Sequence, residues 1–507
     1  MLGARALRAL RALRPVRQLR VGGARGLGRA AGGAGGSKGP SSAKLAEVDK
    51  RLREAKVETV VVGYTDLYGR LLGKRYDVVD FVKNAAKSGA HSCTYVFAVD
   101  MPMNPQPGFE YANWERGFGD FHMVPDLDSL TVCGWAPGVA IVLCDAANTE
   151  THELVSIAPR SILKRQLERA AKLVWEGRHV EVKAASELEH YLFEDDYRGA
   201  HAKGYANLTR AGWYSEDYHI LQGHRTEPYH AAVRRGLRAS GIHVENSKGE
   251  TGVGQHEINV QYDEMLRMAD RHVLFKQCMK EIASDMGKSV TFMAKPFADD
   301  AGSGCHIHTS IVDKATGKNV FQGAESLDSI QNCSALFKHF LAGWIKHTPE
   351  LFCLMAPTVN SFKRHCAGSW APTATAWGKD NRTAGFRIVG SGPSLRIECR
   401  LPGADVNPYL VFASALAAGL DGVENKLAPP PIFEGDAYKK DGNKKRNHAP
   451  LPRSLGEAAE LFAKSKLVKD AFGADVQKHL AHFYHLEQQA YDRQVSDWER
   501  KRYFEQI

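Results

Sequence analysis

One short segment constrains this chain more than any other: the run from Ala184 to Phe193, which carries Glu187 and Glu189. Apolar and polar residues alternate along it, and turn-forming residues follow at 195–199, so the pattern predicts a β-strand. Side chains at i and i+2 of a strand point to the same face, roughly 6.5–7 Å apart. The segment is therefore either an exposed face with two solvated acids or a site for a hard cation that prefers oxygen ligands.

Three later segments repeat this arrangement of polar side chains on a strand face or a glycine-bearing loop. They supply His306, His308 and Ser310 from segment 302–310, Arg396, Glu398 and Arg400 from segment 395–400, and Glu250 and Glu257 from segment 250–257. Together the four segments bring five carboxylates, histidines and arginines. Such a set suits a multi-metal site that handles a polyanion.

The positive charge of the chain is concentrated at its start. Residues 1–46 contain eight Arg and two Lys and no acidic residue; removing these ten from the 67 basic residues leaves 57 against 58 acidic ones. The net charge of +9 is therefore no argument for nucleic acid. An Arg-rich, acid-free segment with interspersed leucines is typical of a transit peptide, so we expect the mitochondrial matrix, with a cytoplasmic or plastid location as the alternatives.

Length and composition place the chain among soluble globular proteins. At 507 residues we expect two domains: a small one at 47–150 and a large one at 151–507, after the basic leader 1–46. No run approaches 18 apolar residues, so no membrane span is expected. The nine cysteines show no CxxC spacing, which argues for reduced thiols and against a zinc or disulfide framework.

Long apolar stripes predict helices between the strands that carry the polar groups. The patterns indicate helices at 161–176, 231–240, 263–286, 327–347 and 407–426. Strands that alternate with long helices favour an α+β fold, in which the polar strands lie side by side in one curved sheet with helices behind it.

With these segments identified, residues 47–507 resemble the type I branch of the glutamine synthetase superfamily. The resemblance implies a small N-terminal β-grasp domain and a large catalytic domain of curved antiparallel sheet backed by helices. It also implies a homo-oligomer of stacked hexameric rings, a dodecamer, with each active site formed between neighbouring subunits.

The resemblance also implies roles for individual residues. Glu187, His306 and Glu398 match one metal site of the family, and Glu189, Glu250 and Glu257 match the other. Gly302, Arg364 and Arg400 match the residues that receive glutamate; Arg382, Arg387 and Arg396 match those facing the ATP phosphates; His308, Ser310, Glu245 and Tyr262 match nucleotide contacts; and Asp66 matches the group that helps to deprotonate the amine across the subunit interface.

The implied reaction has two steps. The γ-carboxylate of glutamate attacks the γ-phosphate of ATP to give γ-glutamyl phosphate, and an amine then displaces phosphate. Two or three Mg²⁺ or Mn²⁺ ions and the arginines offset the repulsion among these polyanionic groups.

The chain departs from family glutamine synthetases at two positions. Trp370, in the run 368–372, stands where the family has a glutamate that closes the ammonium pocket, and Ala301 replaces an Asn before Gly302. An indole cannot accept a proton as a carboxylate does, but it can pack on an alkyl chain. These changes resemble γ-glutamyl-polyamine and γ-glutamyl-monoamine synthetases, with Trp370 in the catalytic set. The alternatives are ammonia-dependent glutamine synthesis and a non-catalytic structural protein.

Overall fold

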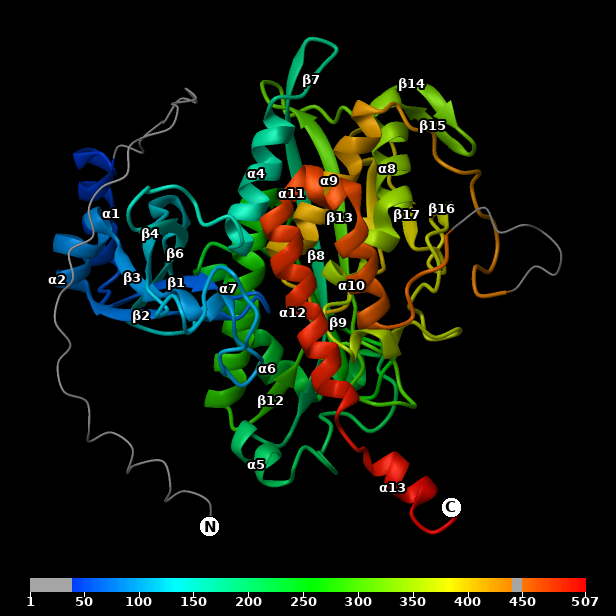
Figure 1. Ribbon diagram of the computed structural model, residues 1–507, viewed down its shortest axis with the longest axis horizontal. Helices are drawn as coiled ribbons and strands as arrows, with labels where there is room; N and C mark the ends of the chain where they lie inside the picture. The colour runs from blue at the N-terminus through cyan, green and yellow to red at the C-terminus, as the bar shows by residue number, and fades with distance from the viewer. Residues whose placement is uncertain (1–38, 440–448) are drawn as a thin grey trace. The chain divides into compact units, whose positions relative to one another are not determined.

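Two β-sheets organise the part of the chain that this computed structural model describes, residues 39–439 and 449–507 (Figure 1). Most of the predicted leader, 1–38, lies outside the described residues. The span Gly39–Ile507 forms one compact unit, in which the first sheet ends at Asn148 and the second begins at Val174. The fold is therefore α+β, as expected. Every helix in the described segments is too short or too polar to cross a bilayer.

The first sheet has the order β2-β1-β6-β4-β3, with β5 paired to β6. Its strands are β1 (Thr59–Thr65), β2 (Leu71–Asp77), β3 (Ala90–Cys93), β4 (Asp120–Pro125), β5 (Thr131–Val132) and β6 (Val139–Asn148). β1 pairs antiparallel with β2 and parallel with β6, a mixed sheet that agrees with the β-grasp expectation. The preceding helix α1 (Ser42–Glu54) buries Val48 and Leu52.

The second sheet has the order β16-β17-β18-β13-β8-β10-β9, and the long strand β8 lies near its centre. Its strands are β7 (Val174–Trp175), β8 (Arg178–Phe193), β9 (Val244–Gly249), β10 (Gln255–Val260), β11 (Asp263–Glu264), β12 (Ser289–Thr291), β13 (Cys305–Asp313), β16 (Trp377–Lys379), β17 (Phe386–Val389) and β18 (Arg396–Cys399). Burial alternates along β8 from Val180 to Glu189, which confirms the predicted strand. A separate hairpin joins β14 (Gln322–Leu327) to β15 (Ile330–Cys333).

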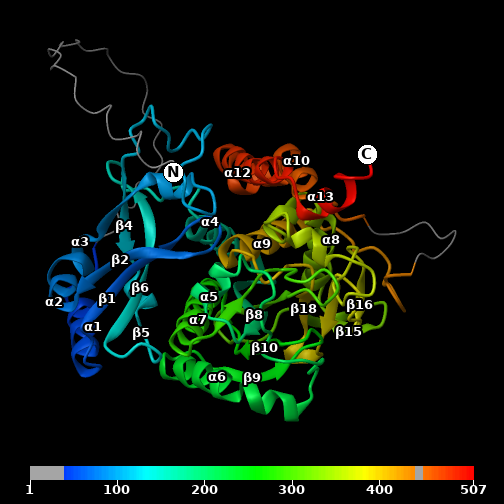
Figure 2. The ribbon, with the colours of Figure 1, turned by 90° about the horizontal axis from the view of Figure 1, so that it is seen from below.

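Helices cover one face of the second sheet, and Figure 2 shows α6 running beside β9 and β10. The helices after the first sheet are α4 (Pro159–Ala171), α5 (Tyr197–Ala202), α6 (Ile220–Ala239), α7 (Met265–Asp285), α8 (Ala335–Leu351), α9 (Pro408–Glu424), α10 (Leu455–Lys464), α11 (Lys466–Phe472), α12 (Ala474–Asp492) and α13 (Asp497–Tyr503). Within the first sheet's domain, short helical turns α2 (Val78–Asp80) and α3 (Ala86–Ser88) flank a π-helical turn.

Three of the predicted helices need correction. The helix expected at 327–347 begins only at Ala335, because 322–333 forms the β14–β15 hairpin and Ser334 caps the helix. The helix expected at 161–176 ends at Ala171, and Val174 already belongs to a strand. The helix expected at 231–240 starts at Ile220, since a Pro inside it and its polar first turns hide the pattern.

Arg160, on α4, ties the first sheet to the helices of the second. Its guanidinium donates to Asp145 at 2.5 Å, to Asp126 at 2.7 Å and to Asp270 on α7 at 3.0 Å. Arg160 is 5% exposed. Tyr409, on the fully buried face of α9, donates to the same Asp270 at 2.6 Å. One buried cation therefore binds three carboxylates from different parts of the chain, and Lys164 adds a second positive charge beside Asp145.

We predict that Arg160→Leu destabilises the protein far more than Arg169→Leu on the same helix. Losing Arg160 leaves buried carboxylates without their cation, at a cost of about 3–5 kcal/mol. Arg169 pairs with the exposed Glu424, and exposed pairs contribute about 0–1 kcal/mol. Urea unfolding of both variants measures the difference; equal losses would contradict this account of the buried network.

Candidate active site

The polar groups of the four segments meet because strand register places them opposite one another. His306 on β13 lies opposite Glu187 on β8, and Glu257 on β10 lies opposite Glu189 on β8. Directly opposed side chains of an antiparallel pair have Cβ atoms about 4.5–5.5 Å apart. The register of three strands thus brings carboxylates from distant parts of the sequence to one face of the sheet.

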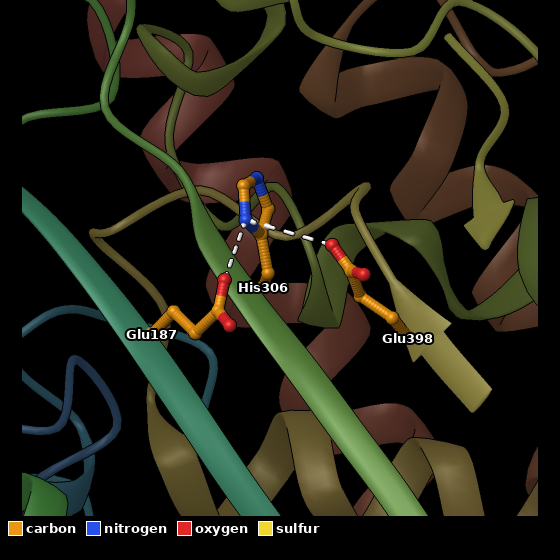
Figure 3. Close-up of side chains that lie close together, drawn as sticks. All are labelled: Glu187, His306 and Glu398. Atoms are coloured by element: carbon orange, nitrogen blue, oxygen red, sulfur yellow. Dashed lines mark hydrogen bonds and ion pairs between the residues drawn. The ribbon is translucent and has the colours of Figure 1, made fainter. Parts of the chain in front are cut away.

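His306 lies at the centre of this cluster (Figure 3). Its Nδ1 is 3.1 Å from Oε2 of Glu187 and 3.9 Å from Oε1 of Glu398, and its Nε2 is 3.8 Å from Oε1 of Glu189. Figure 3 shows Glu187 and Glu398 on either side of the imidazole, each from a different strand. The convergence predicted from the sequence is therefore present.

The cluster fits two divalent cations. Ligand atoms of Glu187, His306 and Glu398 lie within 4.8 Å of one another, and so do those of Glu189, Glu257 and His306. Burial, together with the charges of neighbouring carboxylates beginning with Glu187, raises the pKa of Glu257 well above its usual range. Bound ions would neutralise this repulsion and polarise phosphoryl oxygens. Carboxylate and imidazole donors suit Mg²⁺ or Mn²⁺.

Glu398 is held in its ionised form by cations on both sides. Its carboxylate accepts hydrogen bonds from Arg387 at 2.8 Å and from Arg400 at 2.6 Å. Burial of the carboxyl opposes ionisation, but the charges of His308 and Arg400 outweigh it and lower the pKa of Glu398 to about 2. The same arginines that the resemblance assigns to phosphate and glutamate therefore also orient a predicted metal ligand.

A cavity of about 460 Å³ opens over this cluster. Eleven of the predicted site residues line it: Glu187, Glu189, Glu250, Glu257, Gly302, His306, Arg364, Trp370, Arg382, Arg387 and Arg400. Five carboxylates, with Asp217, and four arginines thus face one space of a volume that is ordinary for small-molecule sites. The arrangement can hold cations beside the acids and anionic substrate groups beside the arginines.

Glycine is required at 302 because Arg364 lies against this turn. A Cβ atom at Gly302 would lie 2.6 Å from the Ala294 carbonyl oxygen and 2.8 Å from Cγ of Arg364, closer than real contacts allow. Arg364 is buried and donates to the carbonyl oxygens of Leu401 at 2.9 Å and Arg400 at 3.2 Å. The guanidinium is therefore fixed at the cavity wall before any substrate arrives.

Other predicted site residues lie beside the cavity or outside it. His308 Nε2 contacts Glu187 Oε1 at 2.9 Å, and Arg396 lies 3.2 Å from His308 Nδ1, so these two extend the cluster. Ser310, Glu245 and Tyr262 do not line the cavity, and Tyr262 is 60% exposed; their nucleotide contacts stay predictions.

Asp66 is also outside the cavity of its own chain. It is fully buried and bound by Arg70, whose Nε donates to its carboxylate at 2.6 Å. The resemblance assigns Asp66 to the active site of a neighbouring subunit, so its catalytic role stays a prediction.

Several cavity residues were missed from the sequence. Lys248, opposite Glu257 in the β9–β10 pair, forms an ion pair with Glu250 and lies 4.5 Å from the ring centre of Tyr218. Gln255 donates to Glu189 at 3.3 Å. Alternation along 244–250 could have placed Lys248 on the face of Glu250, but no local pattern points to Tyr218, which lies in a loop.

Comparisons with known proteins agree with this site. Residues 156–503 match the family model described as glutamine synthetase, catalytic domain. The γ-glutamylethanolamide synthetase GlnA4 of Streptomyces coelicolor is 42% identical over 89% of this chain and 93% of its own length. The glutamate–isopropylamine ligase of a Pseudomonas species is 34% identical over 92% and 98%. The solved structure of apo GmaS superposes with a TM-score of 0.77 at 29% identity, covering 90% of this chain and 99% of GmaS.

The chain therefore belongs to the glutamine synthetase family. It is an ATP-dependent ligase that forms a carbon–nitrogen bond between glutamate and an amine or ammonia. The carboxylate cluster, the arginine-lined cavity and the curved sheet are the features through which its own residues support that chemistry.

We predict that Glu257→Gln stabilises the metal-free protein at alkaline pH and removes its stabilisation by Mn²⁺. The folded-state pKa of Glu257 is raised, so its contribution is present at low pH and is lost as the pH rises through that pKa. The amide of Gln does not ionise, so the variant keeps its stability as the pH rises. The substitution also removes a carboxylate that would bind Mn²⁺ in the native state, and Mn²⁺ binding there would raise Tm. Thermal unfolding with and without Mn²⁺ across the pH range measures both effects.

Glu115→Gln serves as the control, because Glu115 is exposed and does not line the cavity. It should leave the pH profile and the Mn²⁺ shift of the wild type intact. A Glu257→Gln protein that kept the full Mn²⁺ shift would exclude Glu257 as a ligand.

Proposed function

We propose that this ligase joins glutamate to a small organic amine, most readily a monoamine, and uses ammonia poorly. The observation that carries this proposal is Trp370, an indole on the cavity wall at the position where the resemblance places the ammonium-binding glutamate. The two curated relatives described above are named for ethanolamine and isopropylamine. Both named amines carry a short alkyl group, which an aromatic face can cover.

Trp370 is held in a tight loop beside the glutamate arginine. Its φ is 61°, a left-handed conformation that bulky residues rarely adopt, and its side chain is 55% exposed. The neighbouring Ser369 donates to the carbonyl oxygen of Arg364 at 2.9 Å. The loop therefore connects the amine side of the cavity to the glutamate side, and an organic amine would enter along the indole.

The other residues then have the following roles. Arg364 and Arg400 hold glutamate through bidentate guanidinium contacts, while Arg382 and Arg387 face the phosphates of ATP. Closely placed arginines stabilise negative charge on the transferring phosphoryl group. The amine loses a proton as it displaces phosphate, and Asp66 of a neighbouring subunit is the proposed acceptor. Mg²⁺ or Mn²⁺ is the proposed ion.

Ammonia-dependent glutamine synthesis is the second candidate, since the glutamate and ATP sides of the cavity serve both reactions. Use of a polyamine is a further possibility that the present lining does not favour over a monoamine. We also propose a homo-oligomer of stacked rings. We further propose that the leader 1–46 directs import into the mitochondrial matrix, and its Arg-rich, acid-free composition supports this.

A comparison of several amines as substrates, which we call the amine panel, tests the main proposal. Phosphate release by the purified protein is measured with ATP, glutamate and Mg²⁺. The kcat/KM for ethanolamine or isopropylamine should exceed that for ammonium by about tenfold or more. Trp370→Glu should shift this ratio toward ammonium, because a carboxylate attracts NH₄⁺ and accepts a proton. Trp114→Glu, at a 78% exposed Trp outside the cavity, should leave the ratio unchanged.

Faster turnover with ammonium than with every organic amine would make glutamine synthesis the function. An unchanged amine preference in Trp370→Glu would remove Trp370 from the specificity argument.

A second test locates the mature N-terminus. Expression with a C-terminal tag in a eukaryotic cell should give mitochondrial protein shortened within the leader 1–46, as mass spectrometry of the N-terminal peptide would show. Full-length cytoplasmic protein would contradict the targeting proposal.

A further inference from the structure

A second cavity, of about 420 Å³, lies apart from the candidate active site and shares no lining residue with it. Its walls come from the β1–β2 turn, from α7, from the segment after β12, from the segment before α9 and from α12. Its lining includes Arg70, Lys276, Lys280, Thr291, Phe292 and Asp405. Neither the resemblance nor the reaction assigns a role to this space.

Positive charge in this cavity exceeds the negative charge that could balance it. Arg70, Lys276 and Lys280 line it, and Asp405 is its lining carboxylate. In the described segments neither lysine has a carboxylate oxygen within 4.0 Å, and the hydrogen bond of Lys276 goes to the carbonyl oxygen of Ala404 at 3.0 Å. Lys276 is half-buried, and its Nζ lies 5.0 Å from the ring centre of Phe292, whereas Lys280 is exposed.

Asp405 offsets the charge of Lys276 only in part. Its carboxylate accepts hydrogen bonds from Ser361 at 2.6 Å and Thr358 at 2.9 Å, and burial raises its pKa. Burial lowers the pKa of Lys276 to about 8, and burial together with the charge of Arg70 lowers the pKa of Lys280. Arg70 is paired with Asp66, so the two lysines carry the positive charge of the lining that has no carboxylate partner.

We propose that this cavity, which we call the lysine pocket, binds a small organic anion that carries a carboxylate or phosphate group. Lys280 and the two remaining N–H bonds of Lys276 supply charged donors. The Thr291 hydroxyl, which accepts from the Met293 amide at 3.2 Å, has its proton free to donate. Val273, Phe292, Pro357 and Phe483 form apolar walls, which favour a ligand with a carbon skeleton over a bare ion.

The pocket adjoins the turn that carries Asp66. Arg70 lines the pocket and at the same time donates to the Asp66 carboxylate, and the Asn407 side chain donates to the carbonyl oxygens of Asp66 and Leu67 at 3.1 and 3.2 Å. An anion that binds Arg70 competes with Asp66 for the same guanidinium. The site is therefore suited to an effector as well as to a structural ligand.

Titration calorimetry of the assembled protein, without nucleotide or glutamate, tests the pocket. Succinate and inorganic phosphate serve as separate probes. At least one should bind saturably to the wild type, and Lys280→Gln should weaken that binding about tenfold or more, whereas Lys280→Arg should retain it. If Lys280→Gln weakens the binding of succinate alone, the pocket is a carboxylate site. If it weakens the binding of phosphate alone, the pocket is a phosphate site.

Lys172→Gln is the matched control, because Lys172 is exposed like Lys280 but lies at the end of α4 and lines neither cavity. Equal affinity of the wild type and Lys280→Gln for both probes would overturn the proposal. So would the absence of saturable binding at roughly 10 mM of either probe, which is the result expected if a side chain of a second copy fills the pocket. Binding here needs no turnover, so this outcome is distinct from failure of the amine panel.

Discussion

Repulsion among buried carboxylates is the constraint on which this structure depends. Glu187, Glu189 and Glu257 lie on one face of a sheet whose register leaves them no room to separate. Glu257 is buried, and Glu187 and Glu189 are half-buried. A buried carboxylate without a partner costs several kcal/mol, so the group needs neutralising charge. The opposite face of the same strands is covered by helices, so the sheet cannot rotate the acids into solvent without losing its core.

Two kinds of positive charge meet this demand in different ways. Arg387 and Arg400 are permanent cations and keep Glu398 ionised. Glu257, in the cluster around His306, instead has too few cationic partners. Burial and the neighbouring carboxylates therefore raise the pKa of its carboxyl group. The fold thus balances one part of the site with its own side chains, and divalent ions held by the other part would supply the positive charge that phosphoryl transfer between polyanions requires.

Sequence patterns predicted the fold class, the β8 strand and the convergence of the candidate metal ligands. These succeeded because period-two alternation fixes which side chains share a face. The start of α8 was misjudged because the apolar residues Leu327 and Ile330 fit a helical period, while a hairpin pairs them across two strands. Tyr218 was missed because its position depends on a loop whose path is set by tertiary contacts. The lysine pocket was also invisible, because Arg70 and Lys276 are 206 positions apart and only packing brings them together.

Anomalous diffraction at the manganese edge, from crystals grown with Mn²⁺ and a non-hydrolysable ATP analogue, tests the central claim most directly. The account predicts one anomalous peak bounded by Glu187, His306 and Glu398 and a second bounded by Glu189 and Glu257. Manganese peaks elsewhere with none at this cluster, in crystals where the nucleotide analogue is ordered, would contradict it.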